Sequence, residues 1–142
     1  MRKSVVAIVS LVLGVTACTA PAPSNLDLST IRSEANLRKE VRLEEINFPQ
    51  IQQALYKHRE HCQIQFDFSL DPNKVHYATV LYGLEAQPEL AYQAVLSLTY
   101  FSNGKTQVVG HTYYGQQQFL VDAFLQALAK PEVCAEGIAK KE

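Results

Sequence analysis

The middle of the chain alternates apolar and polar residues in a way that predicts β-strands. The clearest alternation runs over residues 64–70, where Ile, Phe, Phe and Leu alternate with Gln, Asp and Ser. Turn residues (Asp-Pro-Asn) follow at 71–73. The same reasoning predicts three further strands, over residues 75–83, 92–101 and 106–113.

The pair Asn103-Gly104 between the last two strands predicts a tight hairpin. Asn-Gly favours the positive φ angles of a two-residue type I′ turn. Such a turn would place Leu98 opposite Val109, on the face that covers the core. The opposite face would then carry an apolar group made of Val95, Phe101 and Val108.

Two segments have the periodicity of amphipathic helices. The first is expected over residues 48–61, because Asn47 and Gln50 can form a capping box and Pro49 suits the first turn. The second is expected to begin near residue 115 and to end before Pro131.

The segment before the first helix is less regular. Residues 29–39 favour a short helix, and residues 41–46 favour a brief strand. Together the elements predict a single α+β domain over residues 29–142. We expect a two-layer sandwich in which a four-stranded antiparallel meander carries both amphipathic helices on one face, with a short extra N-terminal strand as an optional addition.

Length and charge limit the classes of function. The chain has 142 residues, of which 47% are apolar, and this is enough for one compact domain. Lys and Arg number 13 against 14 Asp and Glu. Since there is no basic stripe to neutralise phosphates, we expect no nucleic-acid partner.

The first residues have the pattern of an export signal. Met1, Arg2 and Lys3 form a positive start, and an apolar run follows over residues 5–15. This run is much shorter than the about 20 residues that a membrane-spanning helix needs. We therefore expect residues 1–17 to be a signal peptide that is removed from the mature chain.

The end of this segment, Val15-Thr16-Ala17-Cys18, resembles the lipobox of bacterial lipoproteins. The resemblance covers only residues 1–18. It implies that Cys18 receives a diacylglycerol, usually with a further acyl chain such as palmitate, and becomes the new N-terminus. Two or three chains would anchor the protein stably to a membrane. An ordinary signal peptide with a chance cysteine is the alternative.

The residues after Cys18 add to this picture. In such lipoproteins an aspartate at the next position retains the protein in the inner membrane, so Thr19 favours the outer membrane, with the domain facing the periplasm. Residues 18–28 contain Pro21 and Pro23 and few bulky side chains. We expect them to form a semi-extended tether between the lipid and the domain.

Cys62 and Cys134 are the other two cysteines of the chain. In an exported domain such a pair usually forms a disulfide. Each follows one of the two predicted helices, so a bond between them would join the ends of those helices. Two free thiols, or a pair of metal ligands, are the alternatives.

The densest group of reactive side chains is His-Arg-Glu-His-Cys at residues 58–62. His58 and His61 lie one helical turn apart, and the adjacent Cys62 could add a third metal ligand. The spacing matches neither the HExxH zinc motif nor its inverted form. The alternative is that His61 caps the helix end. We expect no metal and no cofactor, with His58 and His61 as the candidates if a metal site exists.

The sequence contains no recognisable catalytic pattern. It has neither a GxSxG elbow nor a glycine-rich phosphate loop. Asp67 and Asp71 lie on and after a strand, where carboxylates are usually solvated. His111 is expected to be a half-buried, hydrogen-bonded histidine on the core face rather than a general base. We therefore expect a protein that is not an enzyme.

These observations favour an accessory or adapter lipoprotein of the cell envelope. It would bind another periplasmic or outer-membrane protein, or a cell-wall component, through an open sheet face or an exposed edge strand. The candidate face is the one with Val95, Phe101 and Val108, although these are also ordinary strand formers. The alternatives are a carrier of a small ligand or metal with a pocket between helices and sheet, and a hydrolase whose residues converge in space.

Overall fold

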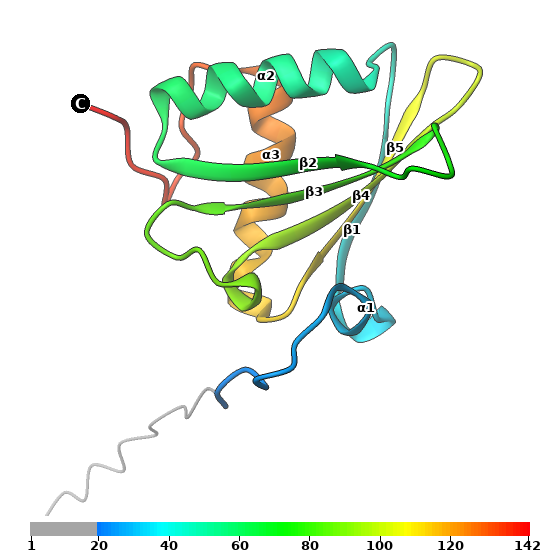
Figure 1. Cartoon of the computed structure of the whole chain (residues 1–142). Coiled ribbons are helices and arrows are strands. Elements are labelled where there is room, and N and C mark those ends of the chain that lie inside the picture. Colours follow the sequence, from blue (N-terminus) through cyan, green and yellow to red (C-terminus); the bar gives the residue numbers. More distant parts are fainter. Residues whose placement is uncertain (1–19) are drawn as a thin grey trace, which may run out of the picture.

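The computed structural model describes residues 20–142 and confirms an α+β fold built on one antiparallel sheet (Figure 1). Cys18 and the predicted signal peptide lie outside the described residues. The sheet has five strands in the order β1-β5-β4-β3-β2. Their bounds are β1 (Leu37–Leu43), β2 (Ile64–Leu70), β3 (Tyr77–Leu84), β4 (Ala94–Tyr100) and β5 (Thr106–Thr112).

The described residues also form α-helices and short 3₁₀ helices. The α-helices are α1 (Leu28–Ile31), α2 (Phe48–His61) and α3 (Phe119–Ala129), and the 3₁₀ helices are η1 (Glu34–Asn36), η2 (Leu90–Tyr92) and η3 (Gly115–Gln118). Within this part of the chain, every helix is too short or too polar to cross a membrane.

α2 occupies the residues that the sequence predicts, because its start is determined locally. The Asn47 side chain accepts a hydrogen bond from the Gln50 backbone N–H, and the Gln50 side chain accepts one from the Asn47 N–H. α3 begins later than the sequence predicts, because residues 115–118 form η3 first and no side chain caps that turn.

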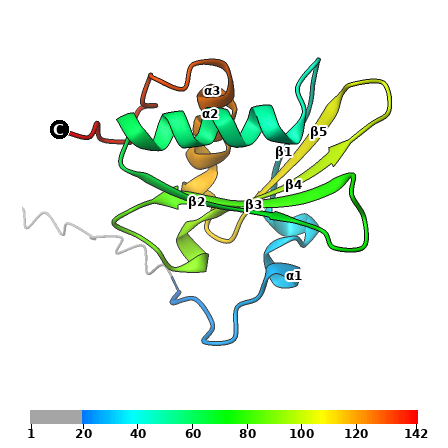
Figure 2. The ribbon, with the colours of Figure 1, turned by 45° about the horizontal axis from the view of Figure 1, so that its top comes forward.

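α2 and α3 pack on the same face of the sheet (Figure 2). This face receives alternate residues of each strand, and together with the helices they form the main core. Gly110 on β5 allows α3 to approach closely, because a Cβ atom there would lie 2.5 Å from Cγ1 of Val121. The largest fully buried side chains of this core are Ile51, Leu55, Ile64, Val80, Tyr82, Leu96, Leu98, Leu120 and Phe124.

The predicted meander is present as β2 to β5, and the optional N-terminal strand is a full fifth strand. β1 pairs with β5 from Leu43 opposite Thr106 to Leu37 opposite His111. It therefore begins within the segment that the sequence assigns to a short helix. Val41 and Leu43, within the predicted strand, pack against the main core, and the pairing with β5 continues beyond them to Leu37.

The hairpin between β4 and β5 has a three-residue loop, so the predicted two-residue turn is wrong. The Phe101 N–H donates to the Lys105 carbonyl, and the Gly104 N–H donates to the Phe101 carbonyl. Gly104 has a φ of 82°, whereas Asn103 is not among the residues with positive φ. A type I′ turn needs positive φ at both central residues. One extra loop residue shifts the register, so that Leu98 faces Val108.

This shift corrects the surface that the sequence proposes. A slip of one residue moves a side chain to the other face of a sheet. Val108 therefore lies in the core beneath the helices, with 1% of its surface exposed. Val95 lies on the other face and is also fully buried. Of the three residues proposed, Phe101 alone retains partial exposure.

The N-terminal segment lies on the face opposite α2 and α3 (Figure 2). Ile31 of α1 is fully buried, although it does not belong to the main core. The Arg32 side chain donates a hydrogen bond to Thr79 on β3. The sequence places residues 20–28 in a free tether, but the carbonyl of Ala20 accepts a hydrogen bond from the Tyr114 hydroxyl.

The predicted disulfide joins Cys62 to Cys134. Cys62 directly follows α2, and Cys134 follows α3 after Pro131. The C-terminal segment beyond the bond also pairs with this region, because the Lys141 N–H donates to the His61 carbonyl. The bond therefore connects the ends of the two helices that cover the sheet.

Candidate functional site

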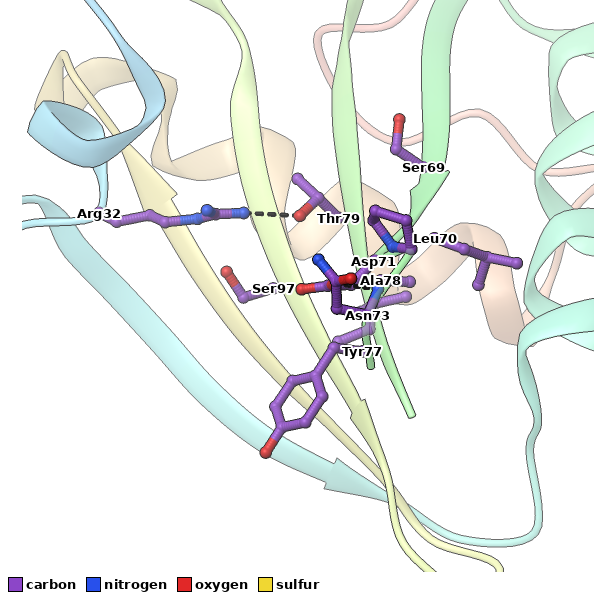
Figure 3. A pocket seen from close by; sticks show the side chains of 11 residues that line it. Arg32, Ser69, Leu70, Asp71, Asn73, Tyr77, Ala78, Thr79 and Ser97 are labelled. Atoms are coloured by element: carbon purple, nitrogen blue, oxygen red, sulfur yellow. Dashed lines mark hydrogen bonds between the residues drawn. The ribbon is translucent and has the colours of Figure 1, made fainter. Parts of the chain in front are cut away.

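A hollow of about 520 Å³ lies at one end of the sheet, on the face opposite α2 and α3. Its walls come from Arg32, directly after α1, from β3 and β4, and from the end of β2 with the turn that follows it. Figure 3 shows Arg32, Thr79, Ser97 and Tyr77 around it. The hollow is lined by both polar and apolar groups and lies away from the region between helices and sheet where the sequence places a ligand pocket.

Arg32 is the cationic side chain of this hollow. It caps the C-terminus of α1, and one of its terminal nitrogens donates to Oγ1 of Thr79 at 2.6 Å (Figure 3). Arg32 is exposed, and no carboxylate of the described residues forms an ion pair with it. A guanidinium has five N–H donors, so several remain for a ligand.

The turn at Asp71 forms the opposite wall. Its carboxylate accepts a hydrogen bond from the Asn73 N–H at 2.8 Å, and its own N–H donates to the Tyr77 carbonyl at 3.0 Å. The first bond is that of an Asx turn, and the second continues the pairing of β2 with β3 by one residue. The turn therefore presents a carboxylate and a tyrosine ring at fixed positions beside the hollow.

β2, which borders this turn, is an edge strand with free backbone groups. In the ladder with β3, hydrogen-bonded pairs occur at Gln63 opposite Glu85 and at Asp71 opposite Tyr77. Pairs alternate in an antiparallel ladder, so the odd-numbered residues of β2 bond to β3. The N–H and C=O groups of Phe66, Phe68 and Leu70 point away from the sheet, and no described residue bonds to them.

The two edges of the sheet differ in their protection. β1 carries four charged side chains, at residues 38, 39, 40 and 42, and its pairing is interrupted between Leu37 and Lys39. Charges and bulges are the usual means of preventing another strand from adding to an edge. β2 has neither an interruption nor a lysine, and Asp67 is its one charged residue. β2 is therefore the edge to which another strand can add.

Exposed apolar side chains gather at the same end of β2. Leu70 is 59% exposed, Val75 is 76% exposed and Tyr77 is 46% exposed. All three lie at the end of β2, at the start of β3 or in the turn between them. An exposed apolar group beside a hollow that also offers polar groups is typical of a surface that contacts another molecule.

Phe101 does not form the open face with Val95 and Val108 that the sequence proposes, because those two side chains are buried. It is half-buried, and the guanidinium carbon of Arg42 lies 5.7 Å from the centre of its ring. Because the cation covers the ring, Phe101 belongs to a local contact between β1 and the hairpin loop.

The structure gives His58 a role within the core. Its Nδ1 lies 2.9 Å from the Pro131 carbonyl, and its Nε2 lies 3.1 Å from the Tyr82 hydroxyl. Both ring nitrogens therefore already have partners, whereas His61 is exposed. Burial lowers the pKa of His58, the hydrogen bond with the Pro131 carbonyl partly opposes this, and the nearby His61 adds a smaller lowering.

No set of three or more His, Cys, Asp or Glu side chains suited to a metal occurs between residues 20 and 142. Cys62, the third candidate ligand, is in the disulfide.

Asp67 is exposed on β2 and lies on the same strand face as Ser69. The Ser69 hydroxyl donates a hydrogen bond to the Asp67 carboxylate.

His111 differs from its predicted role in two respects. It lies opposite Val95, on the face away from α2 and α3, and its buried Nδ1 has no hydrogen-bond partner among the described residues. Burial lowers the pKa of His111, and the charges of Arg32 and Arg38 lower it further. These effects favour the neutral imidazole.

Sequence reasoning missed Arg32 because its position depends on α1 folding back over the sheet. No local pattern marks residue 32 as part of a site. The Asp-Pro-Asn turn marks the end of β2 in the sequence, but the alternation places Leu70 with the apolar residues of one strand face and gives no sign that it is exposed.

No family model, curated protein or solved structure matches this chain. The geometry of the site and the motif at Cys18 therefore carry the functional argument.

Proposed function

We propose that this protein is a lipid-anchored, non-enzymatic adapter of the bacterial envelope that binds an extended segment of another envelope protein along β2. The observation that carries the proposal is the free edge of β2, which ends beside the hollow at Arg32. Addition of a strand to an exposed sheet edge is a common mode of peptide recognition.

The chemistry of the edge indicates how such a segment would bind. Phe66, Phe68 and Leu70 offer backbone donors and acceptors to the added strand. Side chains of the added strand would point alternately to the two faces of the sheet. Those on the face of Ser69 would approach the hollow, where the free donors of Arg32 suit a carboxylate or carbonyl group. Apolar side chains near Leu70 and Val75 would add contact area.

The proposed location rests on the lipobox at Cys18. Acylation there would hold the domain at a membrane, and Thr19 favours the outer membrane with the domain in the periplasm. The disulfide between Cys62 and Cys134 supports an exported location, since such bonds persist in oxidising compartments.

The anchor is tested by the intact mass of the mature protein isolated from cell membranes. We expect a chain that begins at Cys18 and carries the mass of a diacylglycerol, with or without a further acyl chain. A Cys18→Ser variant should lose this mass and leave the membrane fraction. An unmodified N-terminus at another residue would contradict the anchor.

The binding edge is tested by photo-crosslinking in intact cells. A photoreactive amino acid at Ser69, which is exposed beside the edge, should yield one dominant protein adduct in the envelope. The matched control places the same amino acid at Glu40, which is exposed on the protected edge β1. An equal adduct from both positions, or none from Ser69, would contradict binding at β2.

A further inference from the structure

Three tyrosines form a cluster at one end of the domain. The ring centres of Tyr92 and Tyr114 lie 5.4 Å apart, and those of Tyr113 and Tyr114 lie 5.0 Å apart. All three side chains are half-buried. The sheet brings them together because Ala94, at the start of β4, faces Thr112, at the end of β5.

The beginning of the described chain lies against this cluster. The Tyr114 hydroxyl donates to the carbonyl of Ala20 at 3.2 Å. Figures 1 and 2 agree that the N-terminal segment approaches the domain at the end where η2 and η3 lie. In the sequence, Cys18 is two residues before Ala20. Two residues span at most about 7 Å, so a lipid on Cys18 would be attached very near the tyrosines.

The chemistry of this end suits the surface of a bilayer. Tyrosine has an apolar ring and a polar hydroxyl, and it is enriched where proteins meet the membrane–water interface. The adjoining segments, residues 86–92 and 113–118, contain a single charged side chain, Glu89. Contact with the membrane at this end would therefore remove few charges from water.

We infer that the tyrosine cluster (Tyr92, Tyr113 and Tyr114) docks on the lipid bilayer and sets the orientation of the domain at the membrane. This inference rests on the proposed acylation of Cys18. The domain then lies directly on the lipid surface, with the tyrosine cluster in contact with the lipid. It is not held away from the membrane by an extended tether.

The chain lacks tryptophan, so a single introduced tryptophan reports on its own surroundings. The test compares Tyr113→Trp with Tyr77→Trp, which lies on β3 at the other end of the β3–β4 pairing. Each full-length chain is expressed so that the cell processes and acylates it. The membrane-extracted protein is then placed in phosphatidylethanolamine and phosphatidylglycerol vesicles with or without brominated acyl chains, which quench tryptophan on contact.

We expect both variants to float with the vesicles. If the cluster contacts the bilayer, brominated lipid should quench the tryptophan fluorescence of Tyr113→Trp at least about twice as strongly as that of Tyr77→Trp. Tyr92→Trp serves as a second reporter if Tyr113→Trp unfolds, as judged by thermal melting. If the two variants are acylated and vesicle-bound but are quenched equally, the tyrosine cluster does not dock on the bilayer. The proposed acylation of Cys18 would still hold. Absence of the acyl mass would contradict the anchor and, with it, this inference.

Discussion

The Nε2 atom of His58 lies 3.1 Å from the hydroxyl of Tyr82, while Nδ1 of the same ring lies 2.9 Å from the Pro131 carbonyl. Both side chains are fully buried, where α2 meets β3. A neutral ring with its proton on Nδ1 satisfies both bonds, because it donates to Pro131 and accepts from Tyr82. The connection links α2 both to the sheet and to the segment after α3.

This arrangement predicts that acid weakens the fold. The pKa of His58 is lowered by burial, and in an unfolded chain a histidine has a pKa of about 6.5. The unfolded state therefore binds more protons, so the free energy of unfolding is at its full value above about pH 6.5 and decreases as the pH falls below it. His111 contributes with the same sign, since its pKa is also lowered.

Urea unfolding at neutral pH and near pH 5 measures this effect. His58→Gln should reduce the difference in free energy of unfolding between the two conditions, although His111 maintains part of it. The matched control is His61→Gln, because His61 is exposed and should leave most of the difference in place. Equal stability of the unaltered protein at both pH values would contradict this account of His58.

Gly110→Ala is predicted to destabilise the packing of α3 on the sheet. The added Cβ would lie 2.5 Å from Cγ1 and 3.0 Å from Cγ2 of Val121, and a short valine side chain cannot move away. Overpacking of this kind costs about 1–3 kcal/mol. Thermal or urea unfolding measures the loss.

Two further variants make the Gly110 prediction specific. Gly115→Ala is the control, since a Cβ at Gly115 meets no atom within 4 Å. The double variant Gly110→Ala with Val121→Ala should recover part of the loss, because the second change removes the two methyl groups in question. A Gly110→Ala variant as stable as the unaltered protein would show that α3 can shift without cost.

Reduction of the disulfide is predicted to lower the melting temperature substantially. Cys62 and Cys134 are separated by 72 positions, and closing a loop of this length is credited with about 4 kcal/mol in the chain-entropy model. The double variant Cys62→Ser with Cys134→Ser should melt at the temperature of the reduced protein. A melting temperature unchanged after complete reduction, verified by thiol titration, would contradict a stabilising role.

The sequence predicts elements well where neighbouring residues determine them. α2 begins at Phe48 because the capping box at Asn47 and Gln50 is a local interaction, and β2 follows from strict alternation. The predicted two-residue turn at Asn103 is wrong because neighbouring residues do not determine it. Two loop lengths are compatible with Asn-Gly, and the choice between them depends on the pairing of whole strands against the core.

The candidate site was less accessible to sequence reasoning. Val95 and Val108 were assigned to an open face, whereas the register buries Val108 beneath the helices and both side chains are inaccessible. Arg32 reaches Thr79 only because α1 folds over the sheet, a contact that spans 47 positions in the sequence. Such long-range contacts leave no periodic signal.

The central claim, binding along β2, is tested most directly by removing one edge donor. Leu70→Pro deletes a backbone N–H that points away from the sheet, and Leu70 is 59% exposed, so the core is left intact. Leu70→Ala is the matched control, because it removes the same side chain and keeps the N–H. The measurement is the yield of the photo-crosslinked adduct from Ser69 in each background.

We expect Leu70→Pro to lower the yield about tenfold relative to Leu70→Ala, the effect of losing roughly 1.4 kcal/mol of binding free energy with one hydrogen bond. Equal melting temperatures of the two variants would establish that the fold is unaffected. If the adduct forms equally well in both, no strand adds to β2 and the proposed binding mode is wrong.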